Sequence, residues 1–75
     1  MRDDNFEWDD KKAASYRRKH GISFELARGV FEDARGFERP DMDESDEERF
    51  LVTGFAGDRM LTVVFVHRGS RIRII

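Results

Sequence analysis

The sequence predicts an α+β domain in which two N-terminal helices pack on one face of a small twisted antiparallel β-sheet. Two observations predict this fold. Helix start and stop signals fall between residues 9 and 32, and three segments rich in β-branched and aromatic residues follow from residue 49, joined by short glycine-containing turns. A chain of 75 residues suits one domain, so we assign residues 1–75 to a single unit.

The first elements are a short strand and a helix. Residues 5–8 alternate in a way that predicts a strand. Asp9 or Asp10 is then expected to cap a helix that ends near His20, with acidic residues at its start and basic residues at its end, as the helix dipole favours. Gly21 fits the position just after that helix, because glycine takes a positive φ without steric strain.

A second helix is expected from Ser23, its N-cap, to about Glu32. Its apolar residues recur at helical spacing and should face the core: Phe24, Ala27, Val30 and Phe31. Residues 35–39 predict a short strand that ends at Pro40. The acidic run at 41–48 predicts a solvated loop, and it lacks the glycine and glutamate spacing of a calcium loop.

The last three strands are expected at residues 49–56, 60–67 and 71–75, and the short turns between them predict an antiparallel meander. The middle strand is apolar on both faces, which predicts a central position. In the last strand, alternation places the isoleucines on the helix side and the two arginines on the other side.

Composition excludes several classes of protein. The chain has no cysteine, so neither a disulfide nor a thiolate zinc site is expected. The apolar run at residues 60–66 is too short to span a bilayer, and no apolar leader opens the sequence; we therefore expect a cytoplasmic protein without membrane contact. Nucleotide-binding and metalloprotease motifs are missing, so no metal or cofactor is expected. The net charge of −2 does not by itself indicate a nucleic-acid-binding protein.

Five short motifs occur in a characteristic order along the chain: Phe6-Glu7-Trp8-Asp9, Lys19-His20-Gly21-Ile22-Ser23-Phe24, Glu47-Glu48-Arg49-Phe50, Gly54 and Arg71-Ile72-Arg73-Ile74-Ile75. In that order and spacing the chain resembles the BrnT family, small ribonuclease toxins of type II toxin–antitoxin systems with a RelE-like fold. The resemblance covers residues 6–75. It implies cleavage of RNA, inhibition of translation and growth, and neutralisation by a BrnA-type antitoxin, with operator DNA bound only through the antitoxin complex.

The chain departs from the family pattern at Tyr16 and Arg17, where the family has an asparagine and then an aliphatic residue. Family members also continue past the last strand into a basic helical tail, so further residues are expected after Ile75. Three hypotheses therefore stay open. The first is a ribonuclease toxin, and the second is a non-catalytic module that binds the antitoxin and acts as co-repressor. The third is a toxin that has lost its activity.

A ribonuclease that works without a metal needs a base, an acid and cations for the charge on the phosphoryl oxygens. Arg71 and Arg73 are candidate phosphate clamps, because each guanidinium offers a planar fork of donors. Arg49 is expected to join them, and His67 is a candidate for proton transfer. Three further cationic or imidazole side chains are candidates for RNA binding: Lys19, His20 and Arg68.

Structural readings compete with these roles. Arginine that alternates with isoleucine on an edge strand is also typical of a solvated face that prevents aggregation. We expect an electropositive surface around Arg49, Arg71 and Arg73, apart from the acidic loop. We also expect this sheet face to be partly bare. The exposed residues would be Val64, Val66 and Phe55, or, in the opposite register, Leu61, Val63 and Phe65.

Overall fold

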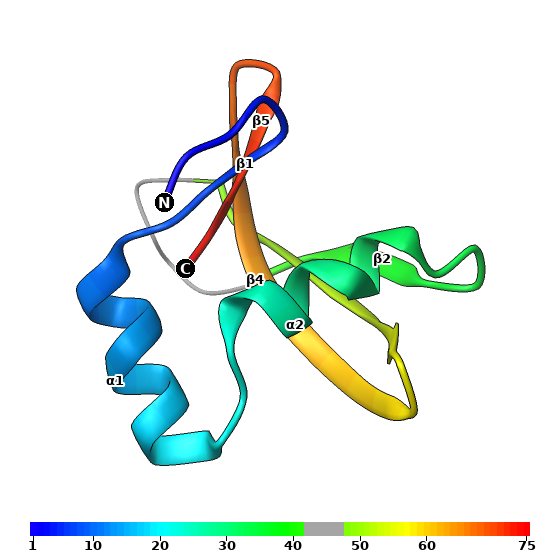
Figure 1. Ribbon diagram of the computed structural model, residues 1–75. Coiled ribbons are helices and arrows are strands. Elements are labelled where there is room, and N and C mark those ends of the chain that lie inside the picture. Colours follow the sequence, from blue (N-terminus) through cyan, green and yellow to red (C-terminus); the bar gives the residue numbers. More distant parts are fainter. Residues whose placement is uncertain (42–47) are drawn as a thin grey trace.

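The computed structural model describes residues 1–41 and 48–75, which form one sheet with helices on one side (Figure 1). The elements follow in the order β1 (Phe6–Glu7), α1 (Asp10–His20), α2 (Phe24–Ala27), the 3₁₀ helix η1 (Arg28–Glu32), β2 (Phe37–Pro40), β3 (Phe50–Ala56), β4 (Arg59–Arg68) and β5 (Arg71–Ile74). The α+β class and the two helices are confirmed. The acidic run predicted as a loop falls largely on residues 42–47, which lie outside the described residues.

The sheet has five strands in the order β1-β5-β4-β3-β2, and it is mixed rather than wholly antiparallel. The three C-terminal strands form the expected meander, to which β2 adds in antiparallel register. The prediction of an antiparallel sheet is wrong at β1, which runs parallel to β5, with Phe6 opposite Ile72. The reason is topological: the two helices, η1 and the strands β2 to β4 all lie between β1 and β5 in the sequence, a connection long enough for parallel pairing.

The first helix is capped as expected but is thinly attached to the domain. Asp9 accepts hydrogen bonds from the backbone N–H groups of Lys11 and Lys12, and Gly21 ends the helix at φ +70°. No residue of α1 is buried. Ala13 packs against the core, and the ring of Tyr16 lies 5.6 Å from that of Phe24.

The second helix is shorter than the sequence predicts. Ser23 caps it by accepting a hydrogen bond from the Leu26 N–H, but the α-helix ends at Ala27 and the chain continues as a 3₁₀ helix to Glu32. The residues after Arg28 are Gly29, a β-branched residue and an aromatic one, all weak helix formers, which explains the early end.

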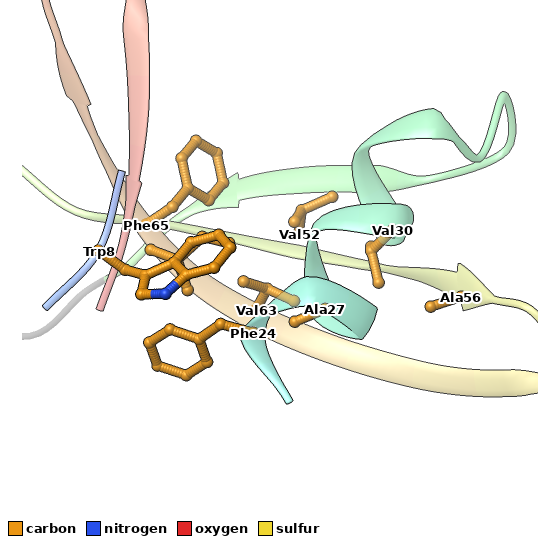
Figure 2. Packing of buried hydrophobic residues seen from close by; sticks show 9 residues of the cluster. Trp8, Phe24, Ala27, Val30, Val52, Ala56, Val63 and Phe65 are labelled. Carbon is orange, nitrogen blue, oxygen red and sulfur yellow. The ribbon is translucent and has the colours of Figure 1, made fainter. Parts of the chain in front are cut away.

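The core lies between the sheet and the pair α2–η1 (Figure 2). Phe65 and Val30 are fully buried at its centre, where Phe31 meets Phe65 edge to face at 5.0 Å. Trp8 closes the core beside Phe24, with ring centroids 5.8 Å apart. Its buried members come from β3, β4, β5, α2, η1 and the segment after β1: Trp8, Phe24, Ala27, Val30, Val52, Ala56, Val63, Phe65 and Ile74.

The register then assigns the other side chains to the opposite surface of the sheet, turned away from α2 and η1, which we call the open face. Residues that alternate with the core positions lie there, and they comprise Phe37, Arg39, Leu51, Thr53, Phe55, Met60, Thr62, Val64, Val66, Arg68, Arg71 and Arg73. Ile74 is buried and Ile72 packs against the core, so the predicted orientation of the last strand is confirmed. No helix in the described residues is both long and apolar enough to cross a membrane.

Candidate functional site: an arginine cluster on the open face

Four arginines gather at one end of the open face. Arg71 stands directly opposite Arg68 across β5 and β4, and Arg73 stands opposite Val66. Arg49 comes one residue before the Phe50–Phe65 pair, so it flanks Val66 from the β3 side. We call Arg49, Arg68, Arg71 and Arg73 the arginine cluster.

The spacing within the cluster suits a phosphodiester. Arg71 and Arg73 leave the same side of β5 about 7 Å apart at Cα, and Arg49 is two strand spacings, about 10 Å, from Arg73. Val66, between Arg73 and Arg49, is only 1% exposed and does not belong to the core between sheet and helices. The aliphatic stems of long cationic side chains commonly cover apolar residues in this way, with their charged ends toward solvent.

Two of the cluster's arginines bind the N-terminal segment. The Arg73 guanidinium donates to the Glu7 carboxylate at 2.7 Å, and Arg71 Nε donates to the backbone carbonyl of Asp3 at 2.8 Å. Both arginines are half-buried. The cluster is therefore built on the parallel β1–β5 pairing, which brings together residues from opposite ends of the sequence.

Arg49 has a carboxylate partner of its own. Its guanidinium lies 3.2 Å from the carboxylate of Asp41. The cluster thus brings four permanent cations together in a chain whose net charge is −2, and carboxylates of Glu7 and Asp41 pair with two of them. The acidic run was expected to stand apart from these arginines, but its first residue, Asp41, pairs with Arg49, and residues 42–47 lie outside the described residues.

The turn that presents the Asp3 carbonyl is itself fixed by charge. The Asp3 carboxylate accepts hydrogen bonds from the N–H groups of Phe6 and Asn5, and these lower its pKa below the usual value. Arg28 adds a hydrogen bond of 2.9 Å to the same carboxylate and lies 4.8 Å from the Phe6 ring centroid. An ionised Asp3 thus holds the turn that receives Arg71.

Comparison with protein families decides what kind of molecule carries this cluster. The family described as "Ribonuclease toxin, BrnT, of type II toxin-antitoxin system" matches residues 8–75. The chain belongs to the BrnT family. A comparison with curated proteins gave no match. Membership of a type II toxin–antitoxin family implies an antitoxin as partner.

The structure does not bring His67 of this BrnT-family chain to the arginine cluster. His67 is paired with Ile72, so its side chain leaves the sheet on the face opposite Arg71 and Arg73. There the imidazole lies 5.3 Å from the Phe50 ring and 5.6 Å from the Phe65 ring. Its surroundings are aromatic, and it cannot share a phosphate with the arginines across the sheet.

Lys19 and His20 lie at the exposed end of α1, next to the end of β5. They line a hollow together with Tyr16 and Ile75, and the His20 ring sits 4.5 Å from that of Tyr16. Ile75 is two residues after Arg73, so the C-terminal end of α1 lies near the end of the strand that carries Arg71 and Arg73. Lys19 and His20 thus lie beyond the end of β5 and do not join the arginine cluster.

Sequence reasoning missed the partners of the cluster and the aromatic residues beyond it. Glu7 and Asp3 carried no local signal, because their contacts with β5 span 66 and 68 residues. Of the three residues expected to show a bare open face, Phe55 is 47% exposed, Val64 is partly buried and Val66 is buried, so the expectation is confirmed at Phe55 and wrong at Val66. Among residues 1–41 and 48–75, no group of three histidine or carboxylate side chains is arranged to hold a metal ion.

Proposed function

We propose that this BrnT-family toxin is an endoribonuclease that cleaves RNA without a metal ion, inhibits translation and is neutralised by a BrnA-type antitoxin. The observation that carries the proposal is the arginine cluster, which places permanent cations on one sheet surface at phosphate spacing. Guanidiniums stay charged at every cellular pH, so they can stabilise the charge that builds on the phosphoryl oxygens in the transition state.

In this mechanism Arg71 and Arg73 grip the non-bridging oxygens of one phosphodiester, and Arg49 approaches from the other side of Val66. The cluster orients the phosphate for attack by the neighbouring 2′-oxygen, whose proton passes to water. The bond from phosphorus to the 5′-oxygen breaks, water protonates the leaving 5′-oxygen, and a 2′,3′-cyclic phosphate remains. Glu7 and the Asp3 carbonyl hold the two guanidiniums in place while no RNA is bound. These contacts keep both guanidiniums on the open face before RNA binds, and the phosphate then takes the place of Glu7 at Arg73.

A second function is favoured by the same contacts. Because Arg71 and Arg73 both have internal partners, they also fit a structural role in a non-catalytic module that binds the antitoxin and reaches operator DNA only through that complex. Arg73 makes an ion pair, and a partly exposed ion pair contributes about 0–1 kcal/mol, so an RNA phosphate can compete with Glu7 for Arg73.

The test is cleavage of total RNA by the purified chain in the presence of EDTA. Arg73→Ala and Arg71→Ala should each lower the cleavage rate by roughly 100-fold, the usual loss for one transition-state donor. Arg59→Ala is the matched control. This substitution removes the same charge, but from the opposite face of β4, so the variant should cleave RNA at the parental rate.

Melting temperatures separate catalysis from folding. Ile74→Ala should destabilise by about 2–5 kcal/mol, because it opens a cavity at a residue that is 2% exposed. The arginine variants should stay much closer to the parent. Intact RNA with the parental chain, together with tight antitoxin binding, would instead support the non-catalytic module.

A further inference from the structure

Two aromatic side chains and one methionine are exposed at the end of the open face that lies away from the arginine cluster. Phe37 is 62% exposed, Phe55 47% and Met60 63%. Phe55 stands opposite Met60, and Phe37 stands opposite Thr53, two residues before Phe55. The two phenyl groups are therefore diagonal neighbours on adjacent strands, with Cα atoms about 7–8 Å apart.

A shallow hollow lies between these side chains. It has a volume of about 330 Å³ and is lined by Phe37, Thr53, Phe55 and Met60, with Asp33 and Arg35 at its rim. The Asp33 carboxylate accepts a hydrogen bond from the Phe55 N–H at 2.8 Å, which fixes the strand under the hollow. A clustered apolar surface of this kind marks a binding site more often than an isolated exposed residue does.

The hollow and the arginine cluster share one surface. Phe55 is six residues from Arg49 along β3, and Met60 is six residues from Val66 along β4, so the two ends lie roughly 20 Å apart on the same face. Arg39 stands between them and donates to Thr53 Oγ1 at 3.1 Å. Aromatic rings and cations therefore follow one another along the sheet.

This order matches the chemistry of single-stranded RNA, which offers phosphates for cations and unstacked bases for aromatic rings. A duplex keeps its bases stacked and cannot use the rings. An apolar protein segment would fill the hollow but would meet the four arginines of the cluster at its other end.

We propose that the open face binds extended single-stranded RNA, with bases stacked on Phe37 and Phe55 while the arginine cluster holds a phosphodiester several nucleotides away. This proposal rests on the ribonuclease function proposed above and extends it by naming the side chains that position the substrate. Phe37 and Phe55 are positioning residues, and the chemistry takes place at the arginines.

The test compares two substitutions at each position. Phe37→Leu and Phe55→Leu keep an apolar side chain but remove the aromatic face, whereas Phe37→Tyr and Phe55→Tyr keep the ring. Binding is measured by fluorescence anisotropy with a labelled 2′-O-methyl oligouridine of about 12 nucleotides, within the usual site size of single-strand binders. Its blocked 2′-oxygen prevents cleavage. Cleavage of unmodified RNA is measured in parallel, and Leu26→Ala, an exposed apolar position on α2, is the control.

The leucine variants should bind the oligouridine at least about 5-fold more weakly, and the tyrosine and Leu26→Ala variants should bind like the parent. RNA cleavage by the leucine variants should show a higher KM with little change in kcat, since stacking positions the substrate before the chemical step. Leucine variants that bind and cleave like the parent overturn the stacking proposal and leave the ribonuclease standing. Leucine variants that lose only antitoxin binding overturn it in favour of a protein-docking surface. A parental chain that neither cleaves nor binds RNA overturns both proposals.

Discussion

Arg73 donates a 2.7 Å hydrogen bond to the carboxylate of Glu7, and the same two residues are register partners in the parallel pairing of β1 with β5. Their side chains are largely shielded, with 28% and 19% exposed. The contact ties the first strand to the last one. It also neutralises one guanidinium of the cluster while no ligand is bound, so Glu7 competes with any phosphate for Arg73.

Replacing Glu7 by glutamine should therefore strengthen RNA binding. Glu7→Gln keeps the size of the side chain and a hydrogen-bond acceptor but removes the competing charge. Affinity for RNA should therefore rise at every salt concentration, and the rise should disappear when Arg73→Ala is added to Glu7→Gln. The free energy of unfolding should fall by about 1 kcal/mol or less. An affinity that stays at the parental value would mean that Glu7 and a phosphate do not compete for Arg73.

The alternation of residues in the last strand predicted which side chains face the core, but it did not predict that Arg73 binds Glu7. Alternation alone placed Ile74 toward the core and Arg73 on the other surface, because the side-chain period of a strand is fixed at two. The Glu7 contact depends on a parallel pairing between segments 66 residues apart, which no local propensity encodes. The same holds for Phe37, whose position beside Phe55 follows from the register between β2 and β3.

His67 tests how far residue type can identify a site. As an imidazole it was a candidate for proton transfer, yet it stands on the other face of the sheet, against Phe50 and Phe65. His67→Gln should leave the cleavage rate and its pH profile between about pH 5 and 8 unchanged. The loss of two aromatic contacts should lower the free energy of unfolding by about 0.5–1.5 kcal/mol. A 100-fold loss of cleavage with an unchanged melting temperature would place His67 in the reaction after all.

Acid should destabilise the fold through Asp33. Hydrogen bonds from the N–H groups of Phe55 and then Arg35 lower the pKa of the Asp33 carboxyl below its ordinary 3.8. A lowered folded-state pKa stabilises the protein above the ordinary value, and this stabilisation is lost as the pH falls through the folded-state pKa.

Asp33→Asn leaves one oxygen for two donors. The variant should therefore be less stable than the parent at neutral pH, and the difference should shrink as the pH falls below 3.8 and the parental carboxyl takes up its proton. Urea unfolding from about pH 2 to about pH 7 measures both curves. Parallel curves across this range would show that the Asp33 charge does not contribute.

The close approach of η1 to β3 should make Gly54 intolerant of any side chain. A Cβ atom there would lie 3.1 Å from Asp33 Oδ2, 3.2 Å from Val30 Cγ1 and 3.3 Å from Gly36 Cα. Gly54→Ala should lower the free energy of unfolding by about 1–3 kcal/mol, because a fully buried valine, a hydrogen-bonded carboxylate and the backbone at Gly36 all resist displacement. It should also disturb the Asp33–Phe55 contact beneath the hollow.

Gly29→Ala is the matched control, since its Cβ would meet Ala56 Cβ at 3.5 Å, an ordinary van der Waals distance. Alanine is also favoured over glycine in a helical segment, so this variant should be as stable as the parent or up to about 1 kcal/mol more stable. Chemical unfolding of both variants gives the comparison directly. Two variants that unfold alike would show that β3 and η1 can separate at Gly54, and that the strand below Phe55 is not held by close packing.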